Sequence, residues 1–212
     1  GNVEGVRIFL LTDAGWKLAA EEQSVKDGLI TSPITQFGVF RLGVAPPVEF
    51  DLPVPKDISL IHIPLRVTEV NGQVMGIKTI GDLYDALGGS ANVNFIITRD
   101  TSAGIWRSYL GPQSKGTKAD PSLTDEPGII PVMKNPVTLR LKGHALGTDG
   151  KSTINLVRGI NLIGVPLKDE RLKRVSDLLS LKGIKDNATS MIVFDSSDGM
   201  FKVVARPGDG GD

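Results

Sequence analysis

Cysteine is absent from this 212-residue sequence, and histidine occurs only twice. Without cysteine the chain can form no disulfide, bind no zinc through thiolates and use no thiol nucleophile. Two histidines leave little room for a histidine-rich metal site or a histidine-based catalytic triad. The sequence therefore predicts no cofactor, no metal site and no catalytic residues, and we expect a protein that is not an enzyme.

An excess of charge of either sign is also missing, because 24 Lys and Arg side chains balance 24 Asp and Glu side chains. Nucleic-acid binders and proteins of anionic membrane surfaces need a basic excess, so neither kind of partner is expected. No apolar run approaches the roughly 18 residues of a membrane-spanning helix, so membrane insertion is not expected. The opening sequence GNVEGV does not resemble a signal peptide.

The sequence does contain many short stretches rich in Val, Ile and Phe, separated by Gly, Pro, Asn and Asp. This alternation predicts a mainly β protein with short helices (α+β) and antiparallel strands. Before residue 45 the predicted strands are Val6–Leu11, Trp16–Ala20, Leu29–Thr31 and Phe37–Val44. Both faces of the last strand are largely apolar, so we expect it to be covered on both sides.

A proline-rich segment follows at residues 45–57. It contains Pro46, Pro47, Pro53 and Pro55, and a proline cannot donate a hydrogen bond to a strand ladder. We therefore expect this segment to be extended, free of regular strand pairing, and the site of a domain boundary.

The strongest pattern is an internal repeat. The sequence ISLIHIPL at residues 58–65 matches INLIGVPL at 160–167 with an offset of 102 residues, and later matches keep an offset of 95. The later matches pair Asp82, Gly88, Asn92, Asp100, Gly104, Trp106 and Pro112 with Asp177, Gly183, Asn187, Asp195, Gly199, Phe201 and Pro207. The repeat predicts a partial segment at 1–50, a complete module at 51–150 and a second module at 151–212.

Each copy is predicted to follow one plan. It opens with a strand that ends in Pro-Leu, Ile58–Leu65 or Ile160–Leu167. A short helix follows, with one apolar stripe and, in the first copy, Thr79 and Asp82 placed to cap it. The stripe residues are Ile80, Leu83, Tyr84 and Leu87 in the first copy and Val175, Leu178 and Leu179 in the second. A hairpin comes last, with the strands Val93–Arg99 and Ile105–Leu110, or Ser190–Phe194 and Met200–Ala205.

The first copy continues into two further strands, Ile129–Met133 and Val137–Lys142. The second copy has no counterpart of residues 118–146, so we expect its sheet to leave backbone groups unpaired at an edge. Apolar side chains should be exposed along that edge, such as Leu162, Ile192 and Val203. Strand addition, within the chain or from a neighbouring subunit, would complete the module and could build a head-to-tail fibre. The simpler alternative is that the missing strands belong to flanking sequence.

Three short motifs suggest binding chemistry but have simpler explanations. GPQSKGTK at 111–118 has the glycine spacing of a phosphate-binding loop but lacks its Gly-Lys-Ser/Thr and a following helix, which favours a linker. DSSDG at 195–199 resembles part of a calcium loop, but a hairpin turn fits its spacing better. The acidic tail at 207–212 could offer oxygens to calcium, and a connecting segment is the simpler interpretation.

A few single residues also deserve a prediction. We expect His62 and His144 to be structural, since neither has a triad partner nearby in sequence. Trp16 and Trp106 each follow a glycine by one or two residues at a hairpin exit, and we expect them to pack in the core or across strands. Asn187-Ala188-Thr189 matches a glycosylation acceptor, a pattern too common to decide anything.

The repeat unit resembles a module found in tandem in large secreted or cell-surface bacterial proteins. The resemblance rests on Gly159–Leu167 as the opening strand, Val175–Leu179 as the helix, and a hairpin with Asp195, Gly199 and Phe201. The first 44 residues separately resemble the last strands of an immunoglobulin-like β-sandwich that ends in Phe37-Gly38-Val39-Phe40. Such proteins are scaffolds, adhesins or matrix components, and the modules have no assigned catalytic residues.

The resemblance implies a non-enzymatic structural or adhesive segment of an extracellular bacterial surface or matrix protein. Its partners would be neighbouring domains or identical subunits that add strands. An alternative is a carbohydrate-binding accessory module of a secreted enzyme, which needs an exposed row formed by Trp16, Trp106, Tyr84 and Tyr109. A third hypothesis is a hydrolase that uses Asp120 and Asp125 as paired carboxylates.

Overall fold

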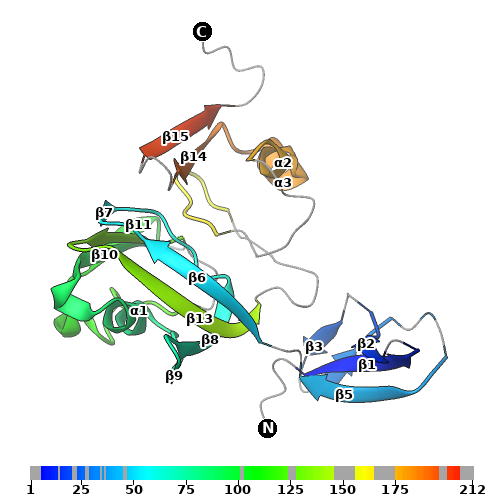
Figure 1. The fold of residues 1–212 in the computed structure, drawn as a ribbon. Helices are drawn as coiled ribbons and strands as arrows, with labels where there is room; N and C mark the ends of the chain where they lie inside the picture. The colour runs from blue at the N-terminus through cyan, green and yellow to red at the C-terminus, as the bar shows by residue number, and fades with distance from the viewer. Residues whose placement is uncertain are drawn as a thin grey trace.

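The computed structural model confirms a mainly β protein with several antiparallel sheets and short helices. The structure describes residues 6–13, 15–20, 23–26, 29–33, 35, 37–44, 47–100, 103–123, 128–145, 156–164, 175–195 and 200–205. Figure 1 shows the strands of these residues gathered into five sheets.

Five strands before residue 45 form the first two sheets. They are β1 (Val6–Thr12), β2 (Gly15–Leu18), β3 (Ser24–Lys26), β4 (Leu29–Thr31) and β5 (Phe40–Val44). β1 lies between β2 and β5, and β3 pairs with β4 in a separate hairpin. The sequence pattern did not predict β3, which is short and carries a single apolar residue, Val25.

The expectation that Phe37–Val44 is a strand covered on both sides is wrong. The strand begins at Phe40, and Phe37 and Val39 lie outside it with exposed side chains. Leu42 within the strand is exposed as well. β5 is the edge strand of a three-stranded sheet, and the exposed Leu42 shows that one of its faces is not covered.

Residues 48–145 contain two four-stranded sheets and a helix. One sheet has the order β6-β13-β8-β9 and the other β11-β10-β12-β7. The strands are β6 (Val48–Val54), β7 (Asp57–Ile58), β8 (Leu65–Val70), β9 (Gln73–Val74), β10 (Val93–Asp100), β11 (Ile105–Tyr109), β12 (Ile130–Met133) and β13 (Val137–Ala145). The helices are α1 (Ile80–Ala86) and two 3₁₀ turns, η1 (Gly89–Ala91) and η2 (Pro112–Ser114).

The prediction that residues 45–57 avoid regular strand pairing is wrong. β6 runs through them and pairs with β13 at seven consecutive positions, from Val48 opposite Gly143 to Val54 opposite Val137. Pro53 is tolerated because β6 is the edge strand of its sheet, where one row of backbone amides needs no partner. β6 also crosses the predicted domain boundary between residues 50 and 51.

The predicted opening strand Ile58–Leu65 is divided between the two sheets. β7 ends at Ile58 and β8 begins at Leu65 in the other sheet. Ile61 and Ile63 are buried on the way, and Ile61 exchanges two backbone hydrogen bonds with Ile129, of 2.8 and 2.9 Å. The apolar run therefore marks a crossing through the core and not one continuous strand.

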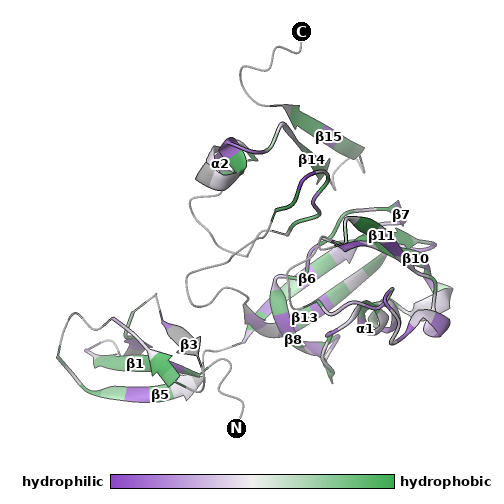
Figure 2. Ribbon diagram, turned by 180° about the vertical axis from the view of Figure 1, so that it is seen from behind, coloured by the Kyte–Doolittle hydropathy of each residue, from purple (hydrophilic) through white to green (hydrophobic). Residues whose placement is uncertain are grey.

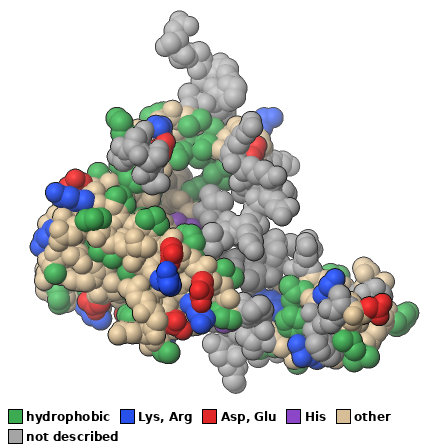
Figure 3. Space-filling view, viewed as in Figure 1, with side chains coloured by type: hydrophobic (Ala, Val, Ile, Leu, Met, Phe, Trp, Pro, Cys, Tyr) green, Lys and Arg blue, Asp and Glu red, His purple; other side chains and the backbone are tan. Residues whose placement is uncertain are grey.

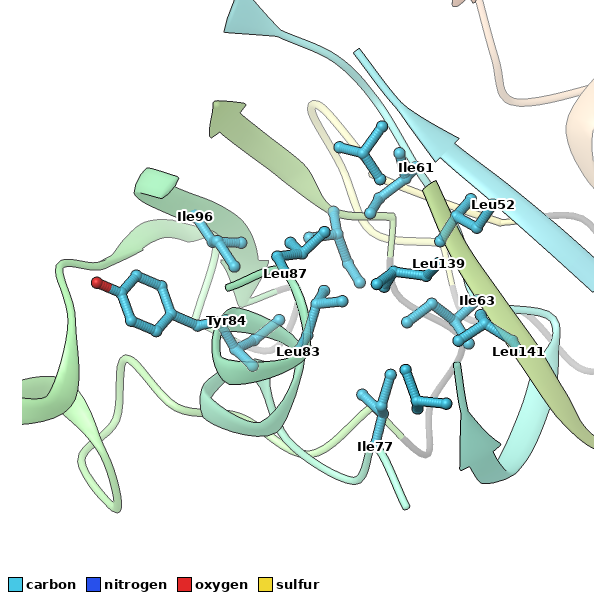
Figure 4. Close-up of a cluster of buried hydrophobic side chains, with 14 of the residues drawn as sticks. Leu52, Ile61, Ile63, Ile77, Leu83, Tyr84, Leu87, Ile96, Leu139 and Leu141 are labelled. Atoms are coloured by element: carbon cyan, nitrogen blue, oxygen red, sulfur yellow. The ribbon is translucent and has the colours of Figure 1, made fainter. Parts of the chain in front are cut away.

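α1 closes the space between the two sheets and is capped as predicted. The Thr79 hydroxyl accepts a 3.2 Å hydrogen bond from the Asp82 amide, and the Asp82 carboxylate accepts one of 3.1 Å from the Thr79 amide. Leu83 and Leu87 are fully buried. Figure 4 shows both side chains among the side chains of the sheets, such as Leu139 of β13.

A second set of elements follows in the same order as the first. α2 (Val175–Ser180) begins 95 residues after α1, and β14 (Ser190–Asp195) ends 95 residues after the end of β10. β15 (Met200–Ala205) begins 95 residues after β11. A short helix, α3 (Lys182–Lys185), stands between α2 and β14.

The described residues of this second set form a small core. Its buried side chains are Leu178, Leu179 and Ile184, and partly buried side chains such as Ile163 and Met191 pack against them. Figure 2 shows that the strands of the β14–β15 hairpin are largely hydrophobic. Of the predicted opening strand Ile160–Leu167, only residues 160–164 are described, and they form no named strand.

Candidate functional site

The stretch at 111–118 is a compact structural loop. The amides of Ser114, Lys115 and Thr117 donate to carbonyls within the loop, at 2.8 to 3.1 Å. The Gly116 amide donates to a carboxylate oxygen of Asp120 at 2.9 Å. A phosphate would need these amides as its donors, so the structure does not favour a phosphate-binding loop here. The segment is an ordered loop and not the expected linker.

Asp120 anchors this loop to α1. Its other carboxylate oxygen accepts a 2.6 Å hydrogen bond from the Gly81 amide in the first turn of the helix. Burial alone would raise the pKa of Asp120, but the hydrogen bonds from the Gly116 and Gly81 amides and the Thr79 side chain, together with the charge of Lys115, outweigh it and lower the pKa below its ordinary value. Asp120 is therefore an ionised structural carboxylate. Asp125, its predicted catalytic partner, lies outside the described residues.

The aromatic row required for sugar binding does not form from the described side chains. Tyr84 and Tyr109 are buried in the core with ring centroids 5.3 Å apart, and burial raises the pKa of Tyr109. Trp106 is 46% exposed, and the guanidinium of Arg99 lies 5.2 Å from its ring centroid. The side chain of Trp16 lies outside the described residues.

The hairpin turns hold ion pairs. Arg107 donates to Asp100 through two nitrogens, at 2.7 and 3.1 Å, and the same carboxylate accepts from the Ala103 amide at 3.0 Å. In the second hairpin Lys202 donates to Asp195 at 2.5 Å. Each pair spans seven residues, and the pairs are 95 residues apart. No cluster of three potential metal ligands occurs among the described residues, and residues 196–199 and 206–212 lie outside them.

The side chain of Asn187, part of the possible glycosylation acceptor, donates to the Gly183 carbonyl at 2.9 Å. Asn92 in the first set of elements donates in a similar way to the Leu87 carbonyl at 3.0 Å. Both amides therefore close the end of a helical segment before a hairpin begins. His144 lies in β13 opposite Arg66, within the strand ladder.

Residues 160–164 lie against the first unit, that is, against residues 48–145. The sequence did not predict this contact. The Gly128 amide donates to the Leu162 carbonyl at 3.3 Å. Gly164 packs against His62 so closely that a Cβ on Gly164 would overlap the imidazole ring. His62 and Gly164 are equivalent positions in the two aligned sequences. The only sign of this contact in the sequence is that the first copy has a histidine where the second has a glycine, which carries no side chain.

The outer face of the β14–β15 hairpin is apolar. Ile192 pairs with Val203, and Phe194 pairs with Phe201 with ring centroids 5.2 Å apart. Ile192 is 54% exposed and Val203 is 68% exposed, in line with the prediction for both, whereas Leu162 is partly buried. Figure 3 shows hydrophobic side chains over this part of the molecule. Among the described strands, β14 pairs with β15 alone.

The outer face of β6 and β13 is charged instead. Arg140 pairs with Asp51 at 3.1 Å, and Lys142 lies within 3.9 Å of both Glu49 and Glu69. A shallow depression lies beside the first pair, lined by Glu49, Phe50, Asp51 and Arg140. Most of these side chains are exposed and mutually neutralised, so the face offers little binding energy to a charged ligand.

No protein-family model, no curated protein and no solved structure matches this chain. None of the helices in the described residues is long and apolar enough to cross a membrane. The geometry of the chain itself is therefore the basis for any functional proposal.

Proposed function

We propose that this chain is a non-enzymatic structural or adhesive segment of an extracellular bacterial surface or matrix protein, built from tandem modules. The proposal rests on the observation that one set of structural elements occurs twice in the same order. A short helix, a hairpin and the ion pair within that hairpin recur 95 residues apart. Repeated units that bury their own cores add length and surface to a chain, which suits a scaffold.

The state of the reactive groups supports the same proposal. Asp120 is held by two backbone amides, and Asp100 and Asp195 are engaged in ion pairs. A general acid or nucleophile needs a carboxylate that can reach a substrate, and these three are occupied by the fold. Partners in this proposal are neighbouring domains or identical subunits that join sheet edges by strand addition.

Light scattering after size exclusion, combined with electron microscopy, tests the assembly over a range of micromolar concentrations. We expect species that grow with concentration and align head to tail. A monodisperse monomer at every concentration would rule out assembly of identical subunits. A screen of the full chain against glycoside, ester and peptide substrates tests the non-enzymatic part, and saturable turnover would contradict it.

A second candidate, a carbohydrate-binding accessory module, is favoured by one observation, the half-exposed indole of Trp106. An aromatic ring that offers one free face can stack on a sugar. Binding on a glycan array that is lost in Trp106→Ala and kept in Trp106→Phe would support this alternative. Equal binding by both variants, or none by the wild type, would remove it.

A further inference from the structure

In the first unit, β10 is paired on both sides. β11 lies along one edge and β12 along the other, with Ile130 opposite Ile97 and Val132 opposite Phe95. β14 takes the place of β10 in the second set of elements. Its partner β15 keeps the register of β11, because Asp195 lies opposite Met200 as Asp100 lies opposite Ile105. No strand among the described residues takes the place of β12 beside β14.

The backbone directions in β12 follow from its hydrogen bonds. Ser59 donates to the Pro131 carbonyl at 3.2 Å, and Ile129 bonds to Ile61, so the backbone groups of these two residues point away from β10. Since successive residues of a strand point to opposite edges, those of Ile130 and Val132 point toward β10. Pro131 therefore fits in this strand, because its missing amide proton would not face β10.

The same alternation assigns the edges of β14. Phe95 and Ile97 form hydrogen-bonded pairs with β12, so their equivalents, Ser190 and Ile192, direct their amides and carbonyls to the edge of β14 that no described strand occupies. Met191 and Val193 direct theirs to β15. The side chain of Met191 faces the small core around Leu178, and Ile192 faces outward.

The side chains of β12 and β14 indicate which kind of strand would fit at this edge of β14. β12 reads Ile-Pro-Val-Met, so it presents apolar side chains on both faces and no charge. The four residues of β14 from Ser190 to Val193 are uncharged as well, so a charged side chain on the core-facing side of an added strand would lose hydration there without gaining a partner. Beyond β12, the Lys134 side chain donates to the Ser90 carbonyl, and the equivalent of Ser90 is Lys185. An acidic residue at the end of the incoming strand would complement Lys185 where a lysine would be repelled.

We propose that the edge of β14 that no described strand occupies, here called its free edge, is an acceptor site for an extended segment of another polypeptide, apolar over four residues and followed by an acidic one. The segment runs antiparallel to β14, with its first and third residues opposite Ile192 and Ser190. This inference rests on the proposed function, since it names the strand that such an assembly would add. Binding would extend the two-stranded sheet and cover the core side of Met191.

Disulfide trapping in the full chain tests the register, because the chain has no cysteine of its own. The probe is a peptide of residues 128–133 with a glutamate added at its end and cysteine in place of Ile130. With Ile192→Cys we expect a mixed disulfide, since hydrogen-bonded antiparallel pairs have Cα atoms about 5.5 Å apart. The matched control is Val203→Cys, on the same face but on β15, which should trap little. Equal trapping at both positions would overturn the proposal. It would also be overturned if Ile192→Cys chains formed disulfides with one another in preference to the peptide.

Fluorescence anisotropy with the cysteine-free peptide tests the backbone pairing. Ile192→Pro removes one amide from the free edge and none from the β15 ladder, so affinity should fall at least about tenfold. Val203→Pro removes an amide from the far edge of β15 and should leave affinity within about twofold. Absence of saturable binding by the wild type, or equal losses in both variants, would overturn the proposal. If the chain binds the peptide but stays monomeric, the acceptor site is supported and self-assembly of identical subunits is contradicted.

Discussion

Gly164 lies directly against the imidazole ring of His62, in a contact between residues that hold equivalent positions in two similar sequences. The ring fills the space that a side chain at Gly164 would need. Together with the hydrogen bond from Gly128 to Leu162, this contact fixes residues 160–164 on the first unit. Because the second copy has glycine where the first has histidine, its segment 160–164 can lie against the first copy.

Gly164→Ala should therefore destabilise the chain. The added methyl group must displace His62 or the segment itself, at a cost of about 1–3 kcal/mol in the free energy of unfolding measured with urea. His62→Ala should relieve the overlap, so that the double variant loses less than the sum of the single losses. Gly183→Ala is the matched control. Nothing lies within 4 Å of a Cβ at Gly183, and alanine favours its helix α3. Additive losses would show that His62 and Gly164 do not interact.

Truncation of the equivalent leucines should separate the two cores. Leu83→Ala removes a fully buried side chain from the large core, and we expect a loss of about 3–5 kcal/mol in the free energy of unfolding. Leu178 is 9% exposed in a core with three buried side chains among the described residues, which can collapse around the cavity, so its truncation should cost about 2 kcal/mol.

Leu181→Ala provides the control for both truncations, because Leu181 is 43% exposed and should change stability by less than about 0.5 kcal/mol. A greater loss from Leu178→Ala than from Leu83→Ala would show that the second core is the better packed of the two.

Local patterns in the sequence predicted the helices and hairpins well. Thr79 and Asp82 form the predicted capping box, and the apolar stripe containing Leu83 faces the core. Asp100 and Asp195 both open hairpins with the predicted strands on either side. These features depend on residues three to ten positions apart, whose spacing is visible in a single sequence.

Features that depend on distant partners could not be predicted in this way. The proline content of residues 48–54 suggested a linker, but β13 supplies a partner about ninety residues later and leaves β6 at a sheet edge. The apolar run Ile58–Leu65 resembled a strand because a segment that crosses a core is as apolar as a strand within one. The anchoring role of Asp120 was missed for the same reason, since Gly81 is 39 residues away.

Removal of the Asp120 charge should weaken the attachment of the loop at 111–120 to α1. Asp120→Asn keeps the shape but loses the charge that two amides stabilise, and we expect a loss of about 1–3 kcal/mol near pH 7. The folded chain lowers the pKa of this carboxyl, so its contribution is present above the unfolded value near 3.8 and disappears as the pH falls through the folded value.

Urea unfolding at pH 7 and below pH 3 measures this dependence. The wild type and Asp120→Asn should differ at neutral pH and converge in acid. A constant difference between them across this range would mean that Asp120 acts through its shape and not through its charge.

The two hairpin ion pairs should differ in strength although they hold equivalent positions. Arg107 and Asp100 are only 18% and 24% exposed, and their contact uses two guanidinium nitrogens, whereas Lys202 and Asp195 are 52% and 33% exposed and share one. Solvent and salt screen the second pair more strongly.

Asp100→Asn should therefore cost about 1–2 kcal/mol in the free energy of unfolding, since Asp100 also accepts from the Ala103 amide. Asp195→Asn should cost about 0.5 kcal/mol or less, and 1 M salt should abolish most of that loss. Urea unfolding at low and high salt checks both values, and equal losses in the two variants would mean that burial does not set the strength of these pairs.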